Sequence, residues 1–207
     1  MGEVRKPTHE QQDGLEKFLT GKQMRVGAYA GCGKTSMLEM MGGATRKRGS
    51  YLCFNSDGAK EDKKKFDGTN VTPSTTHGLA YRALIRDFGE EKLTGGLNGG
   101  YLAARMGLQS IDAAHDVQLS ARGHGALVLD TIKRYCMTAD AQIEPRHVPL
   151  GGRLGDRIVD ERDRRDLARR ISVTAQRTWE RMKDPHNTLP LTHDGYLKLW
   201  ALSRPTI

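Results

Sequence analysis

The sequence predicts an α/β protein with a parallel sheet and a mostly helical inserted subdomain. Up to about residue 88, short apolar runs alternate with helix-length segments, as strands and crossover helices do in a parallel sheet. Strand signals then become sparse, and a glycine-rich stretch leads into segments with helical periodicity. We therefore expect an α/β core over residues 1–88, a helical insert over 89–185 and a return segment over 186–207.

The first expected element is an amphipathic helix that begins near Thr8 and ends before Gly21. Thr8 and Gln11 stand at capping-box spacing, which would account for both residues structurally. A glutamine amide can also donate and accept hydrogen bonds at the edge of an adenine base. The sequence allows Gln11 either role, and the two roles do not exclude each other.

A nucleotide-phosphate site is predicted by residues 28–35, which read Ala-Tyr-Ala-Gly-Cys-Gly-Lys-Thr. They follow an apolar, strand-like run at 24–29 and precede a helix-like run at 36–41, which is the context of a phosphate-binding loop. Gly31 and Gly33 let the backbone wrap a polyphosphate with its N–H groups turned inward, and the helix adds its positive end. The alternative is an ordinary glycine turn between a strand and a helix.

This loop assigns a cofactor and candidate residues. Lys34 is placed to contact the β- and γ-phosphates, and the Thr35 hydroxyl is placed to bind Mg²⁺, so these two are the candidate catalytic residues. ATP and Mg²⁺ are the expected cofactors. The expected nucleotide-binding residues are Gln11, Ala30, Gly31, Cys32, Gly33, Lys34, Thr35 and Ser36.

Further strands and helices are expected after the loop. Residues 50–55 form the second strand candidate and are followed by a basic helix over 59–66. A short third strand at 71–72 precedes a proline, and residues 74–85 lead into another helix. Two helical faces are expected in the insert, the first with Val128, Ile132 and Tyr135 and the second with Leu167, Ile171, Thr174 and Ala175.

The charge balance favours a polyanionic partner. The formal net charge is +8, with basic clusters at 46–48, 63–65 and 162–170. Acidic residues interleave with the last cluster, so we expect it to be a solvated, self-paired helix face. A solvated face is an equally good explanation of the cluster at 63–65.

Composition excludes several classes of protein. No apolar run approaches the roughly 20 residues of a membrane span, and the amino terminus has no apolar core region, so neither a membrane nor secretion is expected. Three widely spaced cysteines form neither a disulfide framework nor a zinc-site spacing. We expect a cytoplasmic protein, in the host cytoplasm or nucleoid if a phage encodes it.

Several stretches together resemble superfamily 1A (UvrD/Rep-like) DNA helicases, in the branch of the F-box DNA helicase and related phage helicases. The resemblance covers nearly the whole chain. The loop differs from the general P-loop pattern at Ala28, where that pattern has its first glycine. Loops of this superfamily resemble the present one at this position. The matching stretches are 8–11 (Q-motif), 28–35 (motif I), 52–59 (motif Ia), 75–82 (motif Ib), and 128–136 and 191–200 (insert and the segment before motif II).

The resemblance implies part of a RecA-like P-loop sheet and an ATP-dependent 3′→5′ DNA helicase that binds single-stranded DNA. Aromatic and imidazole rings can stack on bases, and basic side chains can hold phosphates. The rings of His77 and Tyr81 in motif Ib could instead be packed inside the protein, which is the structural alternative to stacking on bases. The DNA-binding residues implied are Phe54, Asn55, Lys60, Thr76, His77, Tyr81 and Arg82.

The resemblance also implies that an Asp-Glu pair, motif II, follows residues 200–205 on a strand. The one Asp-Glu dipeptide in the sequence, Asp160-Glu161, lacks that context. We therefore expect ATP binding without hydrolysis by this chain alone, a strand at 24–29 without its usual neighbours, and a complementing C-terminal helicase polypeptide. The alternatives are a non-catalytic ATP- and DNA-binding module or truncated remnant, and a small P-loop kinase, which would leave residues 75–82 unexplained.

Overall fold

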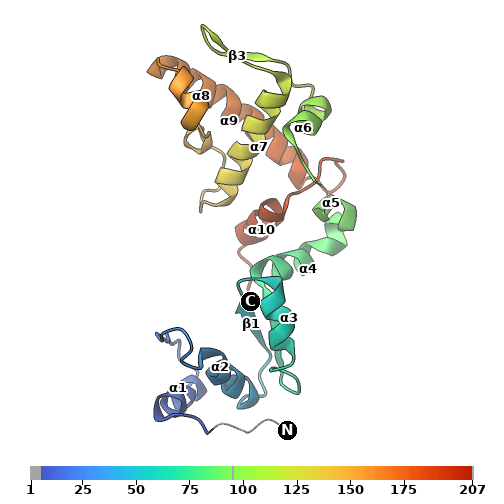
Figure 1. The fold of residues 1–207 in the computed structure, drawn as a ribbon. Helices are drawn as coiled ribbons and strands as arrows, with labels where there is room; N and C mark the ends of the chain where they lie inside the picture. Colours follow the sequence, from blue (N-terminus) through green and yellow to red (C-terminus); the bar gives the residue numbers. More distant parts are fainter. Residues whose placement is uncertain (1–5, 95, 207) are drawn as a thin grey trace. The chain divides into compact units, whose positions relative to one another are not determined.

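The computed structural model describes residues 6–94 and 96–206. The described residues up to Thr76 form one compact unit, called unit 1, and His77–Thr206 form a second, called unit 2 (Figure 1). The protein combines helices with short strands, and helices predominate. No helix within the described ranges combines the length and the apolar character needed to cross a membrane.

Unit 1 contains a parallel pair of strands and three helices. The strands are β1 (Gly49–Cys53) and β2 (Val71–Thr75), with Gly49 opposite Val71 and Cys53 opposite Thr75. This confirms a parallel pairing of the second and third strand candidates, although β2 runs on through Pro73. The helices are α1 (His9–Leu19), α2 (Lys34–Gly43) and α3 (Ser56–Lys63).

The predicted strand at residues 24–29 is wrong for this structure. These residues have no strand conformation and are exposed, with Tyr29 88% and Val26 43% accessible to solvent. A strand is stable only when a neighbour satisfies its N–H and C=O groups. Within the part of unit 1 that is described, the sheet consists of β1 and β2, and neither pairs with this segment. The RecA-like order of strands therefore remains a prediction.

The interior of unit 1 is small. Met37 and Met41 of α2 are buried, and the Met37 sulfur lies 2.8 Å from where a Cβ at Gly14 of α1 would be, so the two helices pack closely. The rings of Tyr51 and Phe66 stack with centroids 4.8 Å apart. These contacts pack α1 against α2, and β1 against the Phe66 ring that follows α3.

Unit 2 is mostly helical, with one β-hairpin. Its short strands, β3 (Ile111–Ala114) and β4 (Val117–Leu119), are antiparallel with a bulge between Asp112 and Ala114. The sequence did not reveal them, because strands of four and three residues are too short to establish an alternating pattern. The helical elements are α4 (Thr76–Phe88, whose first residue belongs to unit 1), α5 (Glu90–Thr94), α6 (Gly99–Met106), α7 (Ala121–Cys136), the 3₁₀ turn η1 (Pro145–His147), α8 (Gly152–Arg157), α9 (Glu161–Lys183) and α10 (His193–Leu202).

The core of unit 2 lies between α7 and α9. Both helical faces expected from the sequence are buried there, with Val128, Ile132 and Tyr135 on α7 and Leu167 and Ile171 on α9. Helices α6 and α7 approach each other so closely that a Cβ at Gly125 would lie 2.1 Å from the carbonyl oxygen of Gly99. This contact requires glycine for lack of space and not for backbone conformation.

Two buried lysines connect segments near α10 by hydrogen bonds to main-chain carbonyl oxygens. Lys92 donates to the carbonyl oxygens of Asn187 and Leu189, both at 2.8 Å. Lys198 donates to the carbonyl oxygens of Thr138 (2.8 Å) and Asp140 (2.6 Å), and its ammonium lies 4.4 Å from the centre of the Tyr135 ring. Burial lowers the pKa of both lysines. Main-chain carbonyls and a ring face thus hold both ammonium groups.

Candidate nucleotide-binding and nucleic-acid-binding sites

The predicted phosphate loop is a glycine turn that opens directly into α2. Gly31 (φ 80°) and Gly33 (φ 71°) both have left-handed backbone conformations, which non-glycine residues rarely adopt. Gly33 is the N-cap of α2 and has no side chain with which to cap the first turn. The N–H groups of that turn, together with the positive end of the helix, are therefore suited to bind an anion.

Lys34, the first residue of α2, reaches back across the loop. Its ammonium donates hydrogen bonds to the carbonyl oxygens of Ala28 (3.0 Å) and Tyr29 (2.6 Å). These contacts close the loop around the lysine side chain, which remains exposed. The Lys34 ammonium is thus hydrogen-bonded within the loop that is predicted to bind phosphates.

Thr35 is half-buried and neighbours a polar cluster on β1 and α3. The side chains of Thr35 and Asp62 both affect the pKa of the Tyr51 phenol. Burial raises the pKa of Tyr51, the Asp62 carboxylate raises it further, and the contact with Thr35 opposes the shift. Asp62 also binds Lys65 at 2.6 Å, and this ion pair lowers the pKa of the Asp62 carboxyl. The threonine hydroxyl and the buried Asp62 carboxylate therefore act on the same phenol, in opposite directions.

Gln11 joins α1 to the loop. Its side-chain oxygen accepts from the Thr8 N–H (3.0 Å), and its main-chain N–H donates to the Thr8 hydroxyl (3.3 Å), which confirms the predicted capping box. Its side-chain amide nitrogen also donates to the carbonyl oxygen of Gly33 (3.3 Å). The structural role of Gln11 is thus shown, and its contact with adenine remains a prediction.

The remaining nucleotide-binding candidates lie on the surface of the same loop. Ala30, Cys32 and Ser36 are all exposed. Across residues 6–94 and 96–206, no three or more histidine, cysteine, aspartate or glutamate side chains form a group able to hold a metal ion. A Mg²⁺ ion at Thr35 would accordingly depend on nucleotide phosphates for most of its ligands, which is usual for this ion.

Four of the DNA-binding candidates lie in unit 1, in settings that differ. Phe54 is fully exposed beyond the end of β1. Asn55 caps α3 by accepting from the Gly58 N–H at 2.7 Å, and Lys60 pairs with Asp57 at 3.4 Å on an exposed helix face. Thr76 is the first residue of α4. Of these side chains, Phe54 alone presents a free flat face for stacking.

The other three candidates, His77, Tyr81 and Arg82, lie on α4 in unit 2. His77 and Tyr81 both contact the ring of Tyr196 on α10, with centroids 6.0 and 6.1 Å apart, in edge-to-face geometry. The ring of His193 also contacts Tyr196, with centroids 5.5 Å apart. Figure 1 shows α4 and α10 next to each other in this unit. We call the side chains of His77, Tyr81, His193 and Tyr196 the ring cluster.

Tyr196 is the buried centre of the ring cluster. It is 4% exposed, and burial raises its pKa. His77 and His193 are accessible, and His77 lies 3.8 Å from the Asp194 carboxylate, each side chain being about two-fifths exposed. His193, Asp194 and Tyr196 are not among the candidates predicted from the sequence, although residues 191–200 contribute to the resemblance. The presence of two rings and a carboxylate within four residues was the available signal.

A cleft of about 410 Å³ adjoins the ring cluster. His193 and Asp194 line one side of it, and Asp130 and Lys133 of α7 line another. The amino-terminal end of α6 also contributes to its wall. A volume of this size is typical of small-ligand sites. The ring cluster and this cleft thus share one residue of α10, His193.

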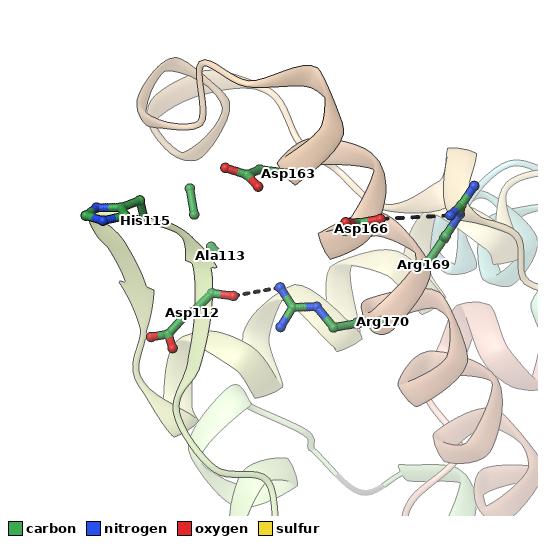
Figure 2. Close-up of a pocket in the computed structure, with 8 residues that line it drawn as sticks. Asp112, Ala113, His115, Asp163, Asp166, Arg169 and Arg170 are labelled. Atoms are coloured by element: carbon green, nitrogen blue, oxygen red, sulfur yellow. Dashed lines mark hydrogen bonds and ion pairs between the residues drawn. The ribbon is translucent and has the colours of Figure 1, made fainter.

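A second, larger cleft lies between the β3–β4 hairpin and α9 (Figure 2). It has a volume of about 630 Å³, and its lining residues all belong to unit 2, so it is separate from the phosphate loop. Asp112 and His115 lie on the hairpin side, and Asp163 and Arg170 lie on the α9 side. The Arg170 guanidinium donates to the carbonyl oxygen of Asp112 at 2.6 Å. Charges of both signs line this cleft.

Residues 162–170 were expected to be a solvated, self-paired helix face, and the solvated part is confirmed, because Arg162, Arg165, Arg169 and Arg170 are exposed. The expected pairing is largely wrong. In the described part of the chain, one ion pair forms within this stretch, between Arg169 and Asp166 at 3.8 Å. Arg164 and Arg170 donate to main-chain carbonyls of Ile158 and Asp112 instead. Their guanidinium groups face neighbouring segments, where carbonyl oxygens are the nearest acceptors.

The chain is similar to two curated proteins over most of its length. It is 31% identical to "F-box DNA helicase 1" of Gallus gallus over 212 residues, which cover 98% of this chain and 20% of that protein. It is 28% identical to "F-box DNA helicase protein 1" of Schizosaccharomyces pombe over 205 residues, which cover 94% of this chain and 22% of that protein. No protein-family model matches the chain, and no solved structure is significantly similar to it. The chain spans about a fifth of the length of these relatives, and the similarity links it to helicases.

Proposed function

We propose that this chain is the ATP-binding part of a superfamily 1A DNA helicase that binds single-stranded DNA, of the branch that includes related phage helicases. The loop before α2 carries this proposal. Two left-handed glycines turn the backbone there, and Lys34 and Thr35 are the first two residues of the helix that follows. The two relatives named as DNA helicases support the same function.

In this proposal, residues 30–36 hold the phosphates of ATP, and Gln11 contacts the adenine. The Lys34 ammonium exchanges its carbonyl partners for the β- and γ-phosphates, because phosphate oxygens carry a full negative charge and carbonyl oxygens only a partial one. Mg²⁺ binds the Thr35 hydroxyl and neutralises charge on the phosphates. Single-stranded DNA is held by the candidates on the β1–α3 turn and on α4, with 3′→5′ translocation as in the superfamily.

The proposal includes a complementing polypeptide that carries the Asp-Glu pair and completes the sheet. Residues 24–29 support this part, because they are apolar and exposed and pair with neither β1 nor β2. An added strand would satisfy their main-chain groups and cover Val26 and Tyr29, which are 43% and 88% exposed.

The test is binding of an ATP analogue and of a single-stranded oligonucleotide by the chain, with hydrolysis measured alongside. Lys34→Ala should lose about tenfold or more in nucleotide affinity, since it removes a charge-assisted contact. Lys22→Ala, which removes an exposed lysine outside the loop, is the matched control. Equal nucleotide affinity of the two variants would refute the site. Lys34-dependent hydrolysis by the chain alone would refute the need for a partner and favour an independent P-loop enzyme such as a kinase.

A non-catalytic ATP- and DNA-binding module is the second candidate. One observation favours it: Asp62, the carboxylate that affects the pKa of Tyr51 together with Thr35, is already paired with Lys65 at 2.6 Å and is 8% exposed. Such a carboxylate is poorly placed to orient an attacking water. Hydrolysis that appears when a polypeptide with the Asp-Glu strand is added would reject this candidate in favour of the helicase.

A further inference from the structure

We propose that the cleft beside the ring cluster takes one unstacked base of single-stranded DNA, stacked on His193, and favours bases that carry an exocyclic amino group. This inference rests on the proposed binding of single-stranded DNA and adds a site and a base preference to it. It makes His193, Asp130 and Asp194 DNA-contacting residues and Tyr196 a positioning residue.

The position of His193 carries the stacking step. One side of its imidazole faces Tyr196, with ring centroids 5.5 Å apart and planes at 43°, and the residue is exposed. Imidazole and aromatic rings are the usual surfaces on which single-stranded bases stack. The free side of His193 is therefore available to a base. His77, whose ring also contacts Tyr196, is the neighbouring surface along the strand.

The charges of the cleft decide which part of a nucleotide enters it. Two carboxylates, Asp130 and Asp194, line it together with one ammonium, Lys133. The carboxylates repel a phosphate but accept hydrogen bonds from an amino group. A base therefore enters the cleft, and Lys133 is the cation nearest to the phosphates outside. The cleft volume of about 410 Å³ is sufficient for one base.

A base preference follows from the same carboxylates. Cytosine presents an N4 amino donor where thymine presents an O4 acceptor. Facing Asp130 and Asp194, the amino group gains a hydrogen bond, whereas the carbonyl oxygen meets a second acceptor. At the ordinary value of a single hydrogen bond, this difference corresponds to about threefold or more in affinity for cytosine over thymine.

The test is fluorescence anisotropy of the full chain with labelled oligo(dC) and oligo(dT) of equal length. The wild type should bind oligo(dC) at least about threefold more tightly. His193→Ala should weaken binding of both oligonucleotides by about fivefold or more, as loss of a stacking surface does. Asp130→Asn should reduce the preference for oligo(dC), because an amide can also donate to the O4 of thymine.

The hairpin supplies matched controls. His115 and Asp116 are also an adjacent, exposed histidine and aspartate, 3.0 Å apart, but they contact no ring of the cluster. His115→Ala and Asp116→Asn should bind like the wild type. Tyr196→Ala should bind as weakly as His193→Ala, since it removes the ring that positions His193. Circular dichroism checks that each variant is folded.

Three outcomes would overturn the inference. The first is that His193→Ala binds no more weakly than His115→Ala, and the second is equal affinity for oligo(dC) and oligo(dT). The third is that no oligonucleotide binds, which would also reject the DNA-binding part of the proposed function. Lys34-dependent binding of an ATP analogue is scored separately, so a failure of the nucleotide site is distinguishable from a failure of this cleft.

Discussion

The side-chain amide of Gln11 donates a hydrogen bond to the carbonyl oxygen of Gly33, 3.3 Å away, and so connects the first turn of α1 with the residue that caps α2. The other end of the same amide accepts from the Thr8 N–H. One side chain therefore supports the fold of α1 and the shape of the phosphate loop. The two contributions can be separated by substitution.

Gln11→Glu should weaken nucleotide binding with little loss of thermal stability. Glutamate keeps the oxygen that accepts from Thr8, because Ser/Thr-x-x-Glu is also a capping box. It cannot donate to the Gly33 carbonyl and places a negative charge beside the loop. Thr8→Ala is the complementary variant, since it should cost about 1 kcal/mol of stability without touching the loop. Equal nucleotide affinity of Gln11→Glu and the wild type would contradict this role.

Tyr51→Phe should reduce the Mg²⁺ dependence of nucleotide binding. The variant removes the phenol oxygen, whose pKa responds to Thr35 and Asp62, but keeps the ring that stacks on Phe66 at 4.8 Å. Thr35 then loses a polar neighbour of its hydroxyl. Titration of nucleotide affinity against Mg²⁺ measures the effect, and thermal melting shows whether stacking is preserved. A Mg²⁺ response identical to the wild type would mean that Tyr51 does not position Thr35.

Gly125→Ala should destabilise unit 2 by about 1–3 kcal/mol or more, the usual cost of overpacking. The added Cβ would lie 2.1 Å from the carbonyl oxygen of Gly99, and backbone cannot move aside as a side chain can. Gly151→Ala is the control, because a Cβ there meets nothing within 4 Å. Chemical denaturation of both variants measures the difference. Similar stabilities would show that α6 and α7 can separate without cost.

Cys136→Ala should make the stability less sensitive to alkaline pH. Burial, reinforced by the Asp194 carboxylate, raises the pKa of Cys136 from 9.0 to about 12. Between these values the unfolded chain has lost the thiol proton and the folded chain has kept it, so stability falls as pH rises. Removing the thiol removes this part of the slope. This slope is measured from the free energy of unfolding between pH 8 and about 12. An unchanged slope in Cys136→Ala would contradict the raised pKa of Cys136.

The sequence was most informative where local chemistry decides the structure. The capping box at Thr8 and Gln11, the glycine turn before α2 and the buried faces of α7 and α9 depend on neighbours a few residues apart. The segment at 24–29 was predicted wrongly, because its apolar pattern indicates a strand only if another strand lies beside it.

The ring cluster shows the same limit for the candidate site. His77 and Tyr196 meet although more than 100 residues separate them, and nothing in either segment specifies that contact. The pairing expected for residues 162–170 was wrong for a related reason. Charge spacing along a helix does not show that carbonyl oxygens of Ile158 and Asp112 lie closer than the acidic neighbours.

The two buried lysines have a consequence for experiments at different ionic strengths. Lys92 and Lys198 are buried, and their ammonium groups are held by carbonyl oxygens of Asn187, Leu189, Thr138 and Asp140, so bulk ions have little access to them. Added salt screens exposed charge pairs and releases polyanions, but it acts little on buried contacts of this kind. Unit 2 should therefore keep its melting temperature in concentrations of salt that would release the proposed DNA ligand, so that bound and free forms of one intact fold could be compared.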